Sequence, residues 1–238
     1  MRNLIFFMSL VSFVGCQPAE EAAPDAVTEE AASTGDSTDP TVSEPDHYKV
    51  EFENDHVRAV RITYAAGEET RMHAHPASVS IFLTNGSGVL ALEDGTEQEI
   101  AFEAGDTIWM DAQSHQPRAN TDFELIQIEL KGGGEAEATS GGLDPTVSEP
   151  DHYKLEFEND HVRAVRITYA AGEATEMHSH PASVSIFLTD GAGVLALEDG
   201  TEQEIAFEAG DTIWMDAQSH QPRANTDFEL IQLELKGR

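Results

Sequence analysis

The sequence has 238 residues, which is enough for one large domain or two small ones. Its 45 acidic and 13 basic residues give a formal net charge of −32 at pH 7. Nucleic acids and anionic membrane surfaces repel a chain this acidic, so neither is expected as a direct partner. Aromatic residues make up only 7% of the chain, so its core must rest on Val, Ile, Leu, Phe and Ala.

The N-terminus has the pattern of an export signal. A short basic start precedes an apolar run from Leu4 to Val14, which is too short to span a bilayer comfortably. Just beyond it lies Cys16, the only cysteine, so the chain cannot form an internal disulfide. Segment 13–16 resembles a bacterial lipoprotein signal, which is cut before the cysteine that then becomes lipid-modified. The alternatives are an ordinary secretory signal and a cytosolic chain with an apolar start.

The lipoprotein interpretation makes residues 1–15 a signal peptide and Cys16 the lipidation site. We then expect an extracytoplasmic protein that is lipid-anchored to the cell envelope and meets the membrane only through that anchor. Gln17 resembles an outer-membrane sorting residue, so the expected location is the periplasm or outer membrane of a Gram-negative host. Residues 16–38 contain no Lys or Arg and are rich in Ala, Glu, Thr and Ser. This composition predicts a disordered acidic tether.

From Asp39 the sequence repeats itself with an offset of 105 residues, so that segment 39–132 matches segment 144–237. This repetition predicts two domains of one fold, 39–132 and 144–238, joined by a flexible linker over 133–143. Domains of this size bury only about 60–68% of their unfolded surface, so a bound metal or a packed neighbour would help them. The copies differ at Val50/Leu155, Glu69/Ala174, Arg71/Glu176, Ala74/Ser179, Asn85/Asp190, Ser87/Ala192 and Ile128/Leu233.

Each copy has the pattern of an all-β domain. Apolar and polar residues alternate in short runs, and no run of twelve residues shows a clean helical period. Asn85-Gly86 and Asp94-Gly95 are hairpin turn signals. Short strands with frequent Gly turns indicate a sandwich, a jelly roll or a small barrel. The predicted strands cover 48–53, 56–64, 79–83, 89–92, 97–102, 107–110 and 123–130.

Histidines recur in a pattern that suits a metal. His73 and His75 are two residues apart in an extended stretch, so their side chains point to the same face. Two imidazoles on one face can share a metal ion at about 2.0–2.1 Å from each nitrogen, and His115 is the candidate third ligand. The alternatives are surface histidines and a barrel that has lost its metal. The matching residues of the second copy are His178, His180 and His220.

The spacing of these residues resembles the cupin superfamily. Gly67, the His73-x-His75 pair, Val79 and Gly86 follow the first cupin motif, and the segment from Gly105 to Asn120 follows the second. Each repeat is also similar to the small cupins associated with β-alanine degradation. The resemblance implies a tandem cupin (bicupin) with two double-stranded β-helix, or jelly-roll, barrels.

The cupin resemblance also implies a metal at the mouth of each barrel, held by two His and a Glu of the first motif and a His of the second. Val79 and Val184 stand where the Glu is expected, which leaves a neutral three-His site like that of some cupin dioxygenases. We therefore expect one divalent metal per domain, which could be Fe, Zn, Cu, Ni or Mn. Three neutral ligands leave its +2 charge intact, which favours a small carboxylate ligand.

Three functions are compatible with such a site. The first is a metal-dependent oxygenase or related oxidoreductase that acts on a small organic acid. The second is a non-catalytic module that binds or senses a small ligand or a metal, and the third is a structural pair of barrels with vestigial sites. No catalytic base can be named from the sequence. The dozen linking residues favour pairing of the two domains within one chain, with a homodimer or two independent domains as alternatives.

Four further residues are weaker candidates for contact with a substrate. Arg118 and Arg223 follow the third His of each copy and could clamp a carboxylate, although a surface ion pair is the commoner role. Tyr64 and Tyr169 could donate a proton near the site, although a strand Tyr more often serves packing. The histidines outside the motif are expected to be solvated; they are His47, His56, His152 and His161.

Overall fold

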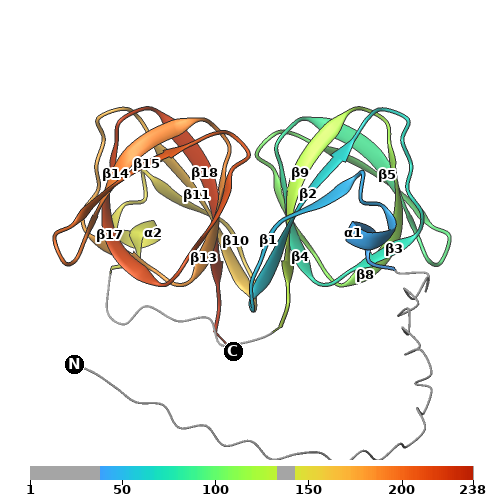
Figure 1. The fold of residues 1–238 in the computed structure, drawn as a ribbon, viewed down its shortest axis with the longest axis horizontal. Helices are drawn as coiled ribbons and strands as arrows, with labels where there is room; N and C mark the ends of the chain where they lie inside the picture. The colour runs from blue at the N-terminus through green and yellow to red at the C-terminus, as the bar shows by residue number, and fades with distance from the viewer. Residues whose placement is uncertain (1–37, 133–142, 238) are drawn as a thin grey trace, which may run out of the picture. The chain divides into compact units, whose positions relative to one another are not determined.

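The computed structural model describes residues 38–132 and 143–237, which belong to one compact unit. The predicted signal peptide, Cys16, the tether as far as residue 37 and linker residues 133–142 lie outside the described residues. The described part of each repeat is built almost entirely of strands, as the sequence predicted (Figure 1). Neither of the two helices in the described ranges is long and apolar enough to cross a bilayer.

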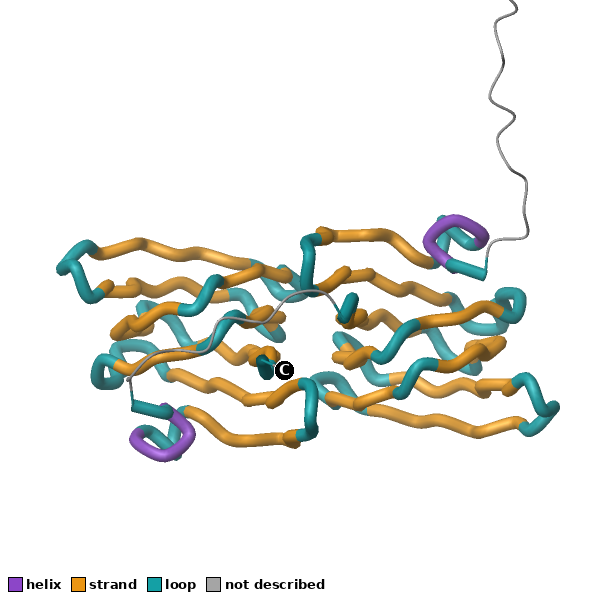
Figure 2. Tube along the Cα trace, turned by 90° about the horizontal axis from the view of Figure 1, so that it is seen from below, coloured by secondary structure: helices purple, strands orange, loops and turns teal. Residues whose placement is uncertain are grey.

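Each repeat begins with one short helix and continues with nine strands in its described residues (Figure 2). In the first repeat they are α1 Pro40–Ser43, β1 Tyr48–Glu53, β2 Val57–Tyr64, β3 His73–His75, β4 Ser78–Phe82, β5 Gly86–Leu92, β6 Glu97–Phe102, β7 Thr107–Met110, β8 Gln113–Ala119 and β9 Phe123–Leu130. In the second they are α2 Pro145–Ser148, β10 Tyr153–Glu158, β11 Val162–Tyr169, β12 His178–His180, β13 Ser183–Phe187, β14 Gly191–Leu197, β15 Glu202–Phe207, β16 Thr212–Met215, β17 Gln218–Ala224 and β18 Phe228–Leu235.

Two antiparallel sheets make up each jelly-roll barrel. The larger sheet has the order β1-β2-β9-β4-β7, and the smaller has the order β3-β8-β5-β6. The second repeat has the same two orders, β10-β11-β18-β13-β16 and β12-β17-β14-β15. Neighbours such as β4 and β9 are far apart in sequence, which is typical of Greek-key connections. Strand β8 was not among the predicted strands, because Pro117 interrupts its pattern.

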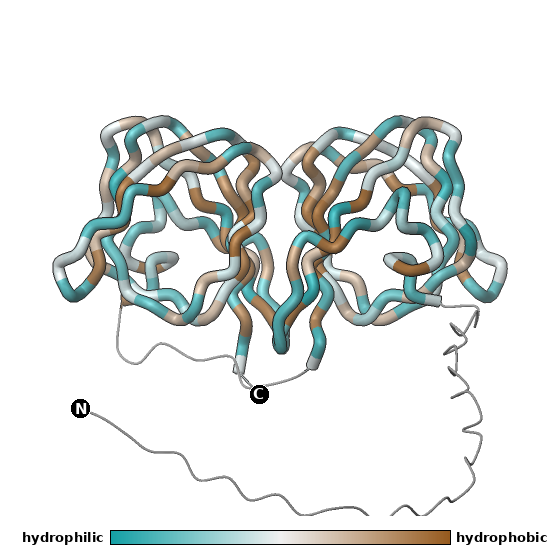
Figure 3. The backbone as a smooth tube through the Cα atoms, in the orientation of Figure 1, coloured by the Kyte–Doolittle hydropathy of each residue, from teal (hydrophilic) through white to brown (hydrophobic). Residues whose placement is uncertain are grey.

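The larger sheet of the first repeat is apolar on both faces. One face carries Ile62, Tyr64 and Leu125 into the interior of the barrel. The other face carries Val79 and Ile128 into a second apolar cluster. Figure 3 shows apolar positions along the strands of both repeats. Because Leu, Ile and Val side chains each contribute about 1.5–3 kcal/mol when fully buried, both faces stabilise the fold.

That second cluster contains residues of both repeats. Val79, Ile81 and Ile128 belong to the same buried cluster as Val184 and Leu233. Polar contacts accompany it: Arg61 donates from Nη2 to the carbonyl of Gly210 over 2.7 Å. The matching Arg166 donates to the carbonyl of Gly105 over the same distance.

Of the histidines outside the motif, His161 is exposed, as expected, whereas His47, His56 and His152 are half-buried, so the expectation that they are solvated was wrong for these three. His56 stacks on Trp214 with ring centroids 5.3 Å apart, and His161 stacks on Trp109 at the same distance. His47 stacks on Tyr64 at 4.5 Å. His152 stacks in the same way on Tyr169.

Candidate metal centres

Strand pairing brings three histidines together in each barrel. His73 and His75 lie on β3, which pairs antiparallel with β8 so that His73 lies directly opposite His115. Residues at i and i+2, and residues directly opposite one another, share a face of a sheet. The three ring centroids are 5.0–5.2 Å apart. His178, His180 and His220 form the same triangle in the second repeat, with centroids 5.0–5.1 Å apart.

The ring nitrogens of each triad can converge on one ion. In both triads one nitrogen of each ring lies within 4.8 Å of the others, and all six histidines are buried. Small side-chain rotations would therefore allow three bonds of about 2.0–2.1 Å to a shared ion. The Nε2 atoms of His75, His178 and His180 are buried without a hydrogen-bond partner among the described residues. A metal ion would satisfy these atoms.

Hydrogen bonds fix the tautomers of the first two histidines. Nδ1 of His73 donates to the carbonyl of Arg71 over 2.8 Å, and Nδ1 of His75 donates to Glu129 over 2.7 Å. Both rings therefore present a bare Nε2. Such partners typically hold a metal-binding imidazole in the orientation that its ligand bond requires. The second repeat repeats both bonds, from His178 to the carbonyl of Glu176 and from His180 to Glu234.

A chain of ion pairs supports Glu129, whose side chain is only 1% exposed. Its Oε2 accepts a hydrogen bond of 2.6 Å from Nε of Arg58, which also donates to Asp39 over 2.7 Å. Burial by itself would lower the pKa of Arg58, but the hydrogen bonds to Asp39 and Glu129 outweigh it and raise that pKa. In the second repeat Arg163 also lies between Asp144 and Glu234, at 3.1 and 3.0 Å, but its Nε has no hydrogen-bond partner among the described residues.

Sequence reasoning missed Glu129 and Glu234. The available signal was the strand itself. In Phe123–Leu130 the residues Gln127 and Glu129 alternate with two isoleucines, and all four are buried. A charged residue in a strand that is buried on both faces needs a polar or charged partner. The histidines of the motif were candidates for that partner.

Each triad offers imidazole ligands only, because no carboxylate of the first motif reaches it. Val79 stands where the cupin motif has its Glu, and it lies in the apolar cluster shared by the two repeats. Its neighbour Ser80 faces the barrel interior instead. Val184 occupies the same environment in the second repeat.

Burial keeps four of the triad imidazoles, those of His73, His115, His178 and His220, uncharged at neutral pH. Burial, followed by the charge of His75, lowers the pKa of His73 to about 4 and that of His115 to about 3. The same causes lower the pKa of His178 to about 4 and that of His220 to about 3. A neutral imidazole is the form that binds a metal ion, so little proton competition is expected near pH 7.

A relay of hydroxyl groups ends at the first triad. The hydroxyl of Tyr48 lies 3.0 Å from Nε2 of His73 and 2.8 Å from the hydroxyl of Tyr64. Tyr64 in turn contacts the Thr70 hydroxyl at 2.8 Å. Burial raises the pKa of Tyr64 to about 12 and raises that of Tyr48 well above its ordinary value. The predicted site residue Tyr64 therefore reaches His73 through Tyr48. Tyr169 makes the same bonds to Tyr153 and Thr175.

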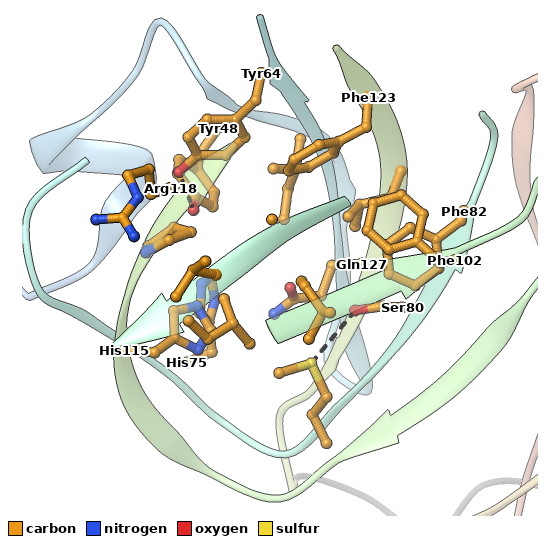
Figure 4. Close-up of a pocket in the computed structure, with 18 residues that line it drawn as sticks. Tyr48, Tyr64, His75, Ser80, Phe82, Phe102, His115, Arg118, Phe123 and Gln127 are labelled. Carbon is orange, nitrogen blue, oxygen red and sulfur yellow. Dashed lines mark hydrogen bonds between the residues drawn. The ribbon is translucent and has the colours of Figure 1, made fainter. Parts of the chain in front are cut away.

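A cavity of about 60 Å³ extends from the first triad into the barrel (Figure 4). His75, His115, Tyr48 and the predicted Arg118 line it. The side chain of Arg118 is 45% exposed, and its Nη2 is 3.9 Å from Glu97, so the ion pair is loose. Arg118 thus combines a surface position with access to the cavity. Each lining residue has an identical counterpart 105 positions later, including Arg223.

Comparison with known proteins identifies the fold. No family model and no curated protein matches the sequence. A cupin 2 conserved barrel domain protein from Leptotrichia buccalis is 14% identical, with a TM-score of 0.51 over 79% of this chain and 88% of that one. AerE from Microcystis aeruginosa is also 14% identical, with a TM-score of 0.52 over 79% and 97%.

A third structure adds a metal protein to these matches. Oxalate decarboxylase from Bacillus subtilis, a protein with Mn(II) centres, is 11% identical, with a TM-score of 0.53 over 78% of this chain and 70% of that one. Identities this low show the fold alone. The chain therefore has two tandem barrels of the cupin fold, as the motif spacing predicted.

Proposed function

We propose that each barrel binds one divalent metal ion through its histidine triad and presents that ion to a small organic acid. The chain would then be a metal-dependent oxygenase or a related oxidoreductase. The supporting observation is the convergence of three buried imidazoles in each barrel, in which Nε2 of His75, His178 and His180 has no hydrogen-bond partner among the described residues. A bound metal would act as a Lewis acid toward the acid or toward water.

The chain's own residues contribute orientation and exclusion of water. Glu129 holds the ring of His75, and the carbonyl of Arg71 holds that of His73. Arg118 is the one cation that lines the cavity, and its guanidinium can pair with a carboxylate. Apolar side chains line most of the remaining wall, so a bound ligand would be largely shielded from bulk water.

A binding or sensing module without turnover is the second candidate. One observation favours it: among the residues that the structure describes, no Asp, Glu or Lys lines the cavity of the first barrel. A general base must lie within hydrogen-bond reach of the proton it removes. Among the described side chains that line it, the groups that could accept a proton are the triad imidazoles and hydroxyls that already make hydrogen bonds.

Metal analysis of the full chain tests the proposal. We expect about two equivalents of divalent metal in protein purified from its native compartment. His73→Ala combined with His75→Ala should halve the metal content, and the matched His47→Ala variant should leave it unchanged. Oxygen uptake with candidate acids would then separate the enzyme from the binding module. Unchanged metal content in the double variant would reject the site.

We also propose that the protein is a lipoprotein anchored to the cell envelope through Cys16. The basic start, the apolar run and the single cysteine support this. Metabolic labelling with a fatty acid should mark the wild-type chain and leave Cys16→Ser unmarked. Equal labelling of the wild type and Cys16→Ser, or no labelling of either, would show that Cys16 does not carry a lipid anchor.

The apolar cluster and the reciprocal arginine contacts favour pairing of the two repeats within one chain. We therefore expect sedimentation of the protein without its signal peptide and lipid anchor to give the mass of one chain. A mass of two chains would favour the homodimer.

A further inference from the structure

We propose that the acid bound by each barrel is a short-chain monocarboxylate with an apolar tail of a few atoms. This inference rests on the proposed function and names the ligand class of the same site. Its basis is the division of the cavity into one polar end and one apolar end (Figure 4).

The polar end is where His75 and His115 lie, with Tyr48 and Arg118 beside them (Figure 4). Arg118 supplies the only positive side chain among the lining residues. A carboxylate is the group that suits this end, because a guanidinium and a neutral three-histidine centre both favour an anion.

Gln127 marks the boundary between the two ends. Its side chain is buried, only 3% of the residue is exposed, and its Nε2 has no hydrogen-bond partner among the described residues. Figure 4 shows this amide inside the cavity, between the histidines and the phenylalanines. A buried donor without a partner is costly, so a ligand oxygen at this level would be favoured in the first barrel. In the second barrel the matching Gln232 donates from Nε2 to the Ser183 hydroxyl over 3.1 Å.

The apolar end is formed by aromatic and aliphatic side chains. Phe82 stacks on Phe102 with centroids 3.8 Å apart, and Phe123 meets Phe102 edge to face at 5.3 Å. Ile100 and Leu125 complete this end. No charged group lies there, so a second carboxylate on the ligand would be buried without a counter-ion. The apolar end therefore selects against longer dicarboxylates.

The size of the cavity limits the tail. A water molecule needs about 10–15 Å³ of such volume, so this cavity of about 60 Å³ accepts roughly four groups of that size. A three- or four-carbon acid fits this limit. The eighteen lining residues are identical in the two repeats, so both barrels should select the same acids.

Titration of the full-length chain loaded with cobalt(II) tests the proposal, because the visible spectrum of the ion reports a new ligand. From formate through acetate and propionate to butyrate, affinity should rise about fourfold per methylene group and then level off for hexanoate. Succinate, which matches butyrate in length, should bind at least tenfold more weakly than butyrate. Equal affinity along the series, or succinate binding as tightly as butyrate, would overturn the ligand class while the metal site stood. Failure to take up cobalt would instead overturn the proposed function, and this inference with it.

Two pairs of variants locate the ligand. Gln127→Leu with Gln232→Leu should keep two cobalt ions and weaken butyrate about tenfold; Gln98→Leu with Gln203→Leu, at exposed positions of β6 and β15, is the matched control. Ile100→Phe with Ile205→Phe, at positions that pack against the phenylalanines, should fill the apolar part, abolish butyrate binding and spare formate. Butyrate binding unchanged in both pairs would show that the acid lies elsewhere.

Discussion

Glu129 accepts a hydrogen bond of 2.7 Å from Nδ1 of His75, although 54 positions separate the two residues in the sequence. The contact joins the larger sheet, which carries Glu129 on β9, to the smaller sheet, which carries His75 on β3. It therefore links the candidate ligand to the part of the barrel with the most extensive core. The equivalent contact between Glu234 and His180 is 2.8 Å long.

Glu129→Gln should weaken metal binding in the first barrel about 10- to 100-fold, because an amide holds the imidazole less firmly than a carboxylate does. Competition with a chromophoric chelator measures this affinity, and the second barrel serves as an internal reference. Glu99→Gln, at an exposed position of β6, is the control. Equal affinity in both variants would mean that Glu129 does not orient the ligand.

Val79→Glu should not restore the carboxylate ligand of the cupin motif. Val79 is fully buried in an apolar cluster, so the new charge would lower the free energy of unfolding by about 3–5 kcal/mol. Urea unfolding measures the loss of stability, and metal titration shows whether the new carboxylate acts as a ligand. Val50→Glu, at a position that is 45% exposed, should be nearly neutral. Tighter metal binding by Val79→Glu without loss of stability would contradict the placement of this residue.

The metal-free protein should lose stability as the pH falls from about 6.5 toward 4. In the folded state the pKa of His73 is about 4 and that of His115 about 3, against an ordinary value of 6.5. Between these values the unfolded chain binds more protons than the folded one, so the free energy of unfolding decreases with decreasing pH. Urea midpoints at pH 7 and pH 5 measure the effect. Replacement of His73, His115 and their copies by Gln should flatten the dependence; an equally steep one would assign it to other groups.

Ile128→Ala should destabilise both repeats together. The side chain is fully buried in the cluster that contains residues of both, and its truncation should cost about 2–5 kcal/mol. The chain has two tryptophans, so Trp109→Phe and Trp214→Phe each leave one reporter. In the Ile128→Ala background both reporters should show the same lowered urea midpoint. Two separate midpoints would mean that the repeats unfold independently.

Much of the fold could be predicted from local pattern. Alternation in runs such as Glu97–Phe102, and turn signals such as Asp94-Gly95, each predict structure from neighbouring residues. Strand β8 was not predicted, because Pro117 lacks a backbone N–H donor and interrupts the strand pattern. In the fold, β8 nevertheless pairs with β3 and β5. A short strand that forms mainly by pairing with distant strands is difficult to predict from its own residues.

The candidate site could be predicted in part. The i, i+2 spacing of His73 and His75 on a strand implies a shared face, and the cupin resemblance supplied His115. The residues that act behind the triad could not be found this way. Glu129 and Tyr48 contact their histidines through side chains from strands far away in the sequence. The pattern of β9 marks Glu129 as a buried charge but does not identify its partner.

None of the seven differences between the repeats falls on a cavity-lining residue; they lie at positions such as Glu69, Arg71 and Ile128. Because the residues that line the first cavity are identical in the second repeat, both barrels should fill at the same ligand concentration. The protein would then give a simple hyperbolic saturation curve with a stoichiometry of two. Duplication of the barrel would double the capacity of the molecule without widening the range of concentrations to which it responds.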